Sequence, residues 1–200
     1  MHTEEGPPAY KDLDLAPGQE TKLIYISGES PDNFTCQLSD SRKHLQTLMD
    51  ELKEYITSCA SEPSSLNLKP GGPILAQHSA RGEWHRAEVM MVDEKGDEVE
   101  VLFVDLGTSE NVPLSNVHKL VPSRFLELPR QALICGLSGI KPISGEWSTE
   151  ARQKFKDLAT SGDVVTATVV SDCEGFVEVR LRSDKCGDFG QELVEAGFAS

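Results

Sequence analysis

The sequence contains no long hydrophobic run. No apolar stretch approaches the roughly 20 residues that a bilayer-spanning helix needs, and the N-terminus lacks the charged and then apolar segments of a secretory signal. We therefore expect an intracellular protein. Hydrophobic residues make up 38% and charged residues 26% of the 200 residues, which is typical of a globular chain. This length is sufficient for one large domain or two small ones.

Closely spaced cysteines are also missing. The five cysteines are odd in number, widely separated and never spaced as CxxC: Cys36, Cys59, Cys135, Cys173 and Cys186. A disulfide framework and a zinc site both depend on organised cysteine spacing. We therefore interpret these residues as reduced, mostly buried thiols.

Positive charge is scarce as well. The chain has 19 Lys and Arg residues against 33 Asp and Glu residues, which gives a formal net charge of -14. Binding to a phosphate backbone depends on clustered cations that release counterions, so direct binding of nucleic acid is not expected. The same negative charge attracts a cationic peptide and speeds its encounter, although solubility alone also favours an acidic surface.

The two ends of the chain carry strand and helix patterns. Residues 1–19 hold several prolines and acids with little apolar periodicity, which predicts a linker or frayed terminus. The other predicted elements are a hairpin at 21–38, amphipathic helices at 41–60 and 148–160, a hairpin at 163–183 that turns at 174–175, and a closing helix at 189–199. The stretch 123–142 is apolar and irregular in pattern.

The central part of the chain reads as short strands joined by turns. The predicted strands are 74–78, 83–92, 98–105 and 109–113. Short strands at such close spacing favour a small, strongly bent antiparallel barrel. The flanking hairpins and helices supply what a five-stranded OB barrel needs. We therefore predict a mainly β protein with helices, in which a small barrel is inserted into an OB barrel.

Several motifs arrive in an order that resembles the extended Tudor domain of germ-cell Tudor proteins. They are "SPDNFTCQL" before the long helix, "GEWHRAEV" and "VLFVDLGTSENV" in the central barrel, "LPRQALICGLSGIKP" after it, and "ELVEAGFA" at the end. The resemblance implies an SH3-like Tudor barrel at 70–122. It implies a staphylococcal-nuclease-like OB subdomain at 20–69 and 123–200, with a tail at 1–19.

The resemblance also implies a function. Extended Tudor domains bind arginine-rich peptides of PIWI-type Argonaute proteins, often with symmetrically dimethylated arginine. Aromatic faces around the methylated guanidinium provide cation–π attraction while its methyl groups leave water. Four rings and one Asn amide form the usual cage.

This sequence departs from the usual cage pattern. Where the family has Trp-Tyr-Arg the chain has Trp84-His85-Arg86, and the preceding ring position offers His78 or Ser79. The usual Asp-Tyr-Gly-Asn is replaced here. It reads Asp105, Leu106, Gly107 and Thr108, which removes one ring and the amide. Phe103 alone keeps its expected aromatic character. The candidate peptide-binding residues are His78, His85, Phe103, Asp105, Leu106 and Thr108.

Structural interpretations of the same residues stay open. His78 and His85 suit ordinary barrel positions, or a pH-sensitive rim whose protonated form repels a guanidinium. The two provide no metal site, because no clear third ligand accompanies them. Trp84 suits the core better than a cage, and Asp105 suits a turn at Gly107 better than an ion pair with a ligand.

Three functions follow from these observations. The first is a non-catalytic interaction module of a germ-granule scaffold in PIWI-interacting RNA silencing, with little or no selectivity for symmetric dimethylarginine. The second is a structural module that self-associates and binds no peptide. The third is a metal-dependent nuclease, which we do not expect, because the nuclease-like segments lack a set of metal-binding carboxylates and arginines. We expect no cofactor, no membrane binding, and a cytoplasmic location in perinuclear germ granules.

Overall fold

The computed structural model describes residues 7–59, 67–119 and 121–200. By their contacts the described residues form two compact units. The inserted unit comprises the described residues up to Leu13 together with Lys43–Gln131, and the flanking unit comprises Asp14–Arg42 and Ala132–Ser200. Packing defines these units, whereas the domain bounds predicted above follow the order of the family's motifs and stay a prediction.

The flanking unit is a closed barrel. Its strands are β1 (Glu20–Ser30), β2 (Asn33–Leu38), β8 (Ala132–Leu137), β9 (Val164–Cys173), β10 (Phe176–Ser183) and β11 (Gly187–Asp188). The sheet order is β11-β10-β8-β2-β1-β9, and β9 also pairs with β10, so that five strands close on themselves. Only β8 and β10 pair in parallel among these strands of the described chain. This arrangement confirms the predicted OB-type barrel.

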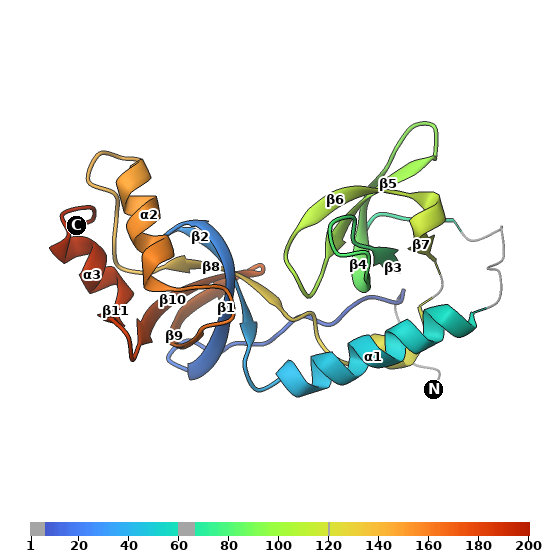
Figure 1. Cartoon of the computed structure of the whole chain (residues 1–200), viewed down its shortest axis with the longest axis horizontal. Coiled ribbons are helices and arrows are strands. Elements are labelled where there is room, and N and C mark those ends of the chain that lie inside the picture. The colour runs from blue at the N-terminus through green and yellow to red at the C-terminus, as the bar shows by residue number, and fades with distance from the viewer. Residues whose placement is uncertain (1–6, 60–66, 120) are drawn as a thin grey trace. The chain divides into compact units, whose positions relative to one another are not determined.

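Two capped helices complete the flanking unit. The helix α2 (Thr149–Leu158) begins after Ser148, whose hydroxyl accepts from the Ala151 N–H at 3.1 Å. The helix α3 (Phe189–Glu195) begins after Asp188. Each cap satisfies a backbone N–H that has no partner within its helix. The helix α2 packs against β1 and α3 against β10, and the two helices contact each other (Figure 1).

The inserted unit contains the small antiparallel barrel that the sequence predicts. Its strands are β3 (Pro73–Gln77), β4 (Trp84–Val92), β5 (Glu98–Phe103), β6 (Ser109–Pro113) and β7 (Val117–His118), in the order β6-β5-β4-β3-β7. A bulge between Val89 and Met91 bends β4. Alternate side chains of these strands form one apolar core that includes Phe103.

The long helix α1 (Arg42–Ser58) confirms the helix predicted at 41–60, although residue 60 lies outside the described ranges. It buries Leu48 and Leu52 against Leu75 and Phe125, so the apolar face of the helix packs within the inserted unit. Short 3-10 turns occupy Leu114–Asn116 and Ser123–Phe125. None of the helices in the described ranges is long and apolar enough to span a membrane.

Two sequence interpretations need correction. The stretch 123–142, predicted to be irregular, contains the central barrel strand β8, and the two-residue strands β7 and β11 were missed. In the stretch predicted as a linker or frayed terminus, residues 7–19 are described and carry two buried side chains, Tyr10 and Leu15. The Tyr10 hydroxyl donates to the Ile74 carbonyl at 2.8 Å, which ties this part of the chain to the inserted unit.

Candidate functional site

Three rings of the predicted site lie together. His78 follows β3, while His85 and Phe103 lie in β4 and β5, and antiparallel pairing of these strands brings the three positions into one place. The ring centroids of His78 and Phe103 are 5.0 Å apart, those of His85 and Phe103 are 5.9 Å apart, and those of the two histidines are 6.1 Å apart. His78 is half-buried, His85 is 5% exposed and Phe103 has no exposed surface.

These distances describe rings in contact with one another. The ring planes are inclined to one another by 39° to 77°, so the three rings meet tilted or edge to face. Because His85 is almost fully buried and Phe103 has no exposed surface, neither ring presents an open face to a ligand, and the cluster is closed in this sense. Phe103, the one ring that keeps the residue type expected in a cage, lies in the apolar core of the barrel.

The loop after β5 supplies no further ring. Leu106 is half-buried and packs against the barrel core, and Thr108 is exposed. The Phe103 N–H donates to the Thr108 carbonyl at 2.9 Å, and Gly107 takes a φ of 76°, which suits a residue without a side chain. The loop thus forms a tight turn that presents an aliphatic group and a hydroxyl, neither of which offers a π face or an amide to a guanidinium.

Asp105 is not available to a ligand in this structure. Its side chain is 2% exposed and accepts from Arg86 through both oxygens, at 2.8 Å from Nε and 2.6 Å from Nη2. The Gln131 N–H donates to the same carboxylate at 3.0 Å. The prediction that Asp105 contacts the peptide is therefore corrected, because a bidentate pair with Arg86 occupies the carboxylate.

Arg86 has a structural role that the sequence motifs did not predict. Besides its two bonds to Asp105, its guanidinium donates to the carbonyls of Phe125, Leu128 and Pro129 at 2.6–3.0 Å, so all five N–H groups have acceptors. The Tyr10 ring lies 5.0 Å from its Cζ. Arg86 therefore fixes the segment after the barrel to β4. Burial raises the pKa of the Tyr10 hydroxyl, although the positive charge of Arg86 acts in the opposite direction.

The histidine environment favours the neutral form of His85. Burial lowers the pKa of His85, although the Glu83 carboxylate, 3.7 Å from its Nε2, acts in the opposite direction. This Nε2 atom is buried and has no hydrogen-bond partner. Nearby, Glu110 accepts from the Ser79 N–H at 2.8 Å and from its hydroxyl at 2.7 Å, which fixes the turn beside His78.

Trp84 has a structural role. Trp84 packs against the cluster formed by α1 and Phe125, in agreement with its assignment to the core. Within the described ranges, no group of three or more His, Cys, Asp or Glu side chains is arranged to hold a metal ion.

A profile of the Tudor domain family matches residues 15–139, more than half of the chain. The chain belongs to the Tudor domain family. The Tudor and KH domain-containing protein of Homo sapiens is 30% identical over 187 residues, which cover 88% of this chain and 33% of that protein. Tudor domain-containing protein 1 of Oryzias latipes is 34% identical over 186 residues, which cover 92% of this chain and 15% of that protein. This Tudor chain thus spans a third or less of the length of these relatives.

Solved extended Tudor domains have the same fold. The extended Tudor domain of human TDRD1, in complex with a symmetrically dimethylated peptide, superimposes with a TM-score of 0.84 at 30% identity and covers 96% of this chain and 95% of its own. The extended Tudor domain TD3 of mouse TDRD1, with a MILI peptide containing dimethylarginine, gives 0.84 at 26% identity, with 95% and 97% covered. These matches confirm the predicted Tudor barrel and nuclease-like OB fold, and indicate a family of interaction modules.

Proposed function

We propose that this Tudor chain is a non-catalytic module that binds an arginine-containing peptide through a degenerate cage, with little or no selectivity for symmetric dimethylarginine. The observation that carries the proposal is the closed cluster of His78, His85 and Phe103 beside a loop with Leu106 and Thr108 in place of a ring and an amide. The peptide class follows from the complexes of human and mouse TDRD1.

The expected partner is a PIWI-type Argonaute or another germ-granule protein, and the expected location is the cytoplasmic, perinuclear germ granule. The MILI peptide bound by the extended Tudor domain TD3 of mouse TDRD1 supports the choice of partner. The formal charge of -14 supports a cationic ligand. An arginine side chain needs only acidic and polar groups on the surface, whereas recognition of its methyl groups needs open aromatic faces.

The loss of rings sets the expected size of the effect. Each well-placed ring contributes roughly 0.5–2 kcal/mol to cation–π binding. Two or three missing faces remove several kcal/mol, which is on the order of a hundredfold in the dissociation constant. The preference for methylated arginine that open cage rings provide is therefore expected to disappear in this chain.

The decisive experiment compares two peptides of one arginine-rich sequence, unmodified and symmetrically dimethylated, by isothermal titration calorimetry. We expect dissociation constants that agree within about threefold, because the closed ring cluster gains nothing from the methyl groups. A preference of more than tenfold for the dimethylated peptide would contradict the proposal.

A variant that restores the cage residues tests whether their absence explains the expected lack of selectivity for dimethylarginine. The triple change His85→Tyr, Leu106→Tyr and Thr108→Asn returns the family's residue types to three positions. It should increase affinity for the dimethylated peptide at least about tenfold while affinity for the unmodified peptide changes little. The matched control places two tyrosines at exposed positions away from the cluster, His44→Tyr and Met91→Tyr, and should leave both affinities unchanged.

A self-association module is the second candidate. Met90 and Met91 are 46% and 60% exposed at the bulge of β4, and exposed methionines adapt readily to partner surfaces. In that case the mass measured by analytical ultracentrifugation should rise with protein concentration and neither arginine peptide should bind. A constant monomer mass together with peptide binding supports the first candidate.

A further inference from the structure

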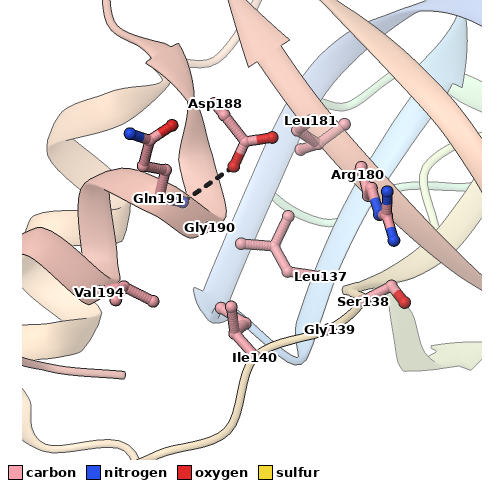
Figure 2. A pocket seen from close by; sticks show the side chains of 10 residues that line it. All are labelled: Leu137, Ser138, Gly139, Ile140, Arg180, Leu181, Asp188, Gly190, Gln191 and Val194. Atoms are coloured by element: carbon pink, nitrogen blue, oxygen red, sulfur yellow. Dashed lines mark hydrogen bonds between the residues drawn. The ribbon is translucent and has the colours of Figure 1, made fainter. Parts of the chain in front are cut away.

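The flanking unit contains a cavity of about 360 Å³ that the arginine site does not use. Figure 2 shows it between the end of β8, the strand β10 and the helix α3. Its volume lies within the range of small-ligand pockets. All of its walls come from one unit, so its shape is a property of the OB barrel itself.

The floor of the cavity is aliphatic. Leu137 and Leu181 are buried strand residues, and the more exposed Ile140 and Val194 add to the apolar lining. Val194 is 43% exposed although it belongs to a helix that packs against the barrel. Removing such a surface from water is favourable by roughly 25 cal/mol per Å², so the cavity suits a branched aliphatic side chain.

One wall of the cavity carries unused hydrogen-bond donors. Arg180 is exposed, and its side chain has no hydrogen bond or ion pair with any residue that the structure describes. Arg182, two residues along the same strand, differs in pairing with Glu20 at 3.0 Å. Figure 2 shows Ser138 beside Arg180, on the side of the cavity opposite Gln191 and Val194.

Backbone N–H groups lie next to this wall. Gly139 lines the cavity with its backbone, because it has no side chain, and its φ of 78° is the left-handed conformation found in anion-binding turns. The N–H groups of Gly139 and Ile140 donate no hydrogen bond within the described ranges. The cavity thus places several hydrogen-bond donors beside an apolar floor: a guanidinium, a hydroxyl and two free N–H groups. The donors suit a carboxylate, and the floor suits an aliphatic side chain next to it.

We propose that this cavity is a second peptide-binding site, which takes an acidic-aliphatic segment of a partner protein. The carboxylate pairs with Arg180 and Ser138, and the aliphatic side chain next to it packs on Leu137, Ile140 and Val194. Asp188 at the α3 side, whose carboxylate accepts from the Gln191 N–H at 2.8 Å, orients the segment by repelling the acidic end. The module would then hold a basic and an acidic segment at separate sites.

A protein segment fits this cavity better than a nucleic acid strand does. Binding of single strands relies on a groove of many cations and on aromatic rings that stack on bases. The residues that line this cavity include one arginine and no aromatic ring. The chain as a whole carries a formal charge of -14, which opposes a phosphate backbone far more than it opposes a single carboxylate.

The test uses two short peptides with blocked ends, one with leucine followed by glutamate and one with leucine followed by glutamine. Each is titrated into the full chain labelled with ¹⁵N, and amide shifts are followed by NMR. We expect the glutamate peptide to shift the amides of Gly139, Ile140 and Val194 with a millimolar dissociation constant. The glutamine peptide should bind at least about tenfold more weakly, because a charge-assisted pair is lost.

Two variants separate binding from folding. Arg180→Gln should remove the difference between the two peptides, while the control Arg182→Gln on the same strand should preserve it. Dispersed NMR spectra check that both variants are folded, and a titration with unmodified arginine peptide checks the Tudor site independently. The proposal is overturned if the peptide shifts only amides outside the cavity, or shifts none at millimolar concentration. Equal binding of both peptides to the parent chain also overturns it. So does a thymidine oligonucleotide that shifts the same amides in place of the peptide.

Discussion

At the scale of single residues, Arg86 has a structural role although it belongs to the motif Trp84-His85-Arg86, which supplies a cage ring in the family. It follows the residue that would be a cage ring, yet it has no exposed surface and all of its N–H groups have acceptors within the inserted unit. Its pair with Asp105 is buried on both sides. Removing one partner of such a pair is costly because the other charge stays buried.

Lysine keeps the charge but not all of these bonds, so we predict that Arg86→Lys destabilises the chain by about 1–3 kcal/mol for each buried acceptor that loses its donor. A lysine ammonium offers three donors from one atom and cannot reproduce the planar fork that reaches Asp105 and three carbonyls. Urea unfolding followed by tryptophan fluorescence measures the change. The control Arg182→Lys alters an exposed pair with Glu20 and should cost less than about 1 kcal/mol. A similar loss in both variants would contradict the role assigned to Arg86.

His85 predicts a pH effect on stability. Burial lowers its pKa in the folded chain, so as the pH falls below about 6.5 the unfolded chain takes up a proton that the folded chain does not. The free energy of unfolding should therefore decrease between pH 7 and pH 5, by about 1.4 kcal/mol for each unit of difference in pKa.

His85→Tyr removes this contribution and keeps a ring at the position. We expect its free energy of unfolding to change less than that of the parent between pH 7 and pH 5. Glu110 does not interfere: burial raises its pKa, but the two bonds from Ser79 and the charge of His78 lower it overall, so its contribution is lost only at more acidic pH. Parallel pH curves of parent and variant would show that His85 does not titrate differently in the two states.

Part of the site could be predicted from the sequence. The clustering of His78, His85 and Phe103 could be predicted from their positions in the predicted strands, because neighbouring antiparallel strands bring such positions together. The hydrogen-bond partners of Asp105 could not be predicted in this way. Its partners are Arg86, 19 residues earlier, and the backbone of Gln131, 26 residues later, and no local pattern reports them.

At the scale of elements, periodicity predicted the helices and both hairpins, because their contacts are local in sequence. The strand β8 was missed for the opposite reason. It pairs in parallel with β10 and antiparallel with β2, both distant along the chain, and neighbouring Pro129 and Gly139 give the stretch the composition of a loop. Its assignment as a strand depends on partners that a local pattern does not contain.

The strand β1 offers a sharp test of close packing. A Cβ atom at Gly28 would lie 2.6 Å from the Phe34 Cβ and 2.7 Å from the Tyr25 hydroxyl oxygen, beside irregular pairing with β2. Gly28→Ala should destabilise the barrel by about 1–3 kcal/mol, because the Phe34 Cβ is attached to the backbone and cannot turn aside. The neighbouring Ser27 is exposed, so Ser27→Ala should change the free energy of unfolding by less than about 0.5 kcal/mol. Urea unfolding measures both variants. Equal stability of the two variants would show that β1 and β2 relax freely.

At the scale of the whole molecule, the excess of acidic residues determines how a basic ligand arrives. A formal charge of -14 produces an attractive field for an arginine-rich peptide at distances where no side chain is yet in contact. Salt shortens that field, with a Debye length of about 10 Å at 0.1 M. Packing of methyl groups on rings is much less sensitive to salt, so the salt response separates the two modes of binding.

We predict that the association rate of an unmodified arginine-rich peptide falls at least about tenfold between 50 and 300 mM NaCl, while the dissociation rate changes less. Stopped-flow fluorescence with a labelled peptide measures both rates. A lysine-substituted peptide of the same charge should show the same salt dependence of association, whereas a citrulline-substituted peptide should lose it. If the arginine peptide instead associates at a rate that does not depend on salt, the acidic surface serves solubility alone, and short-range contacts must select the ligand.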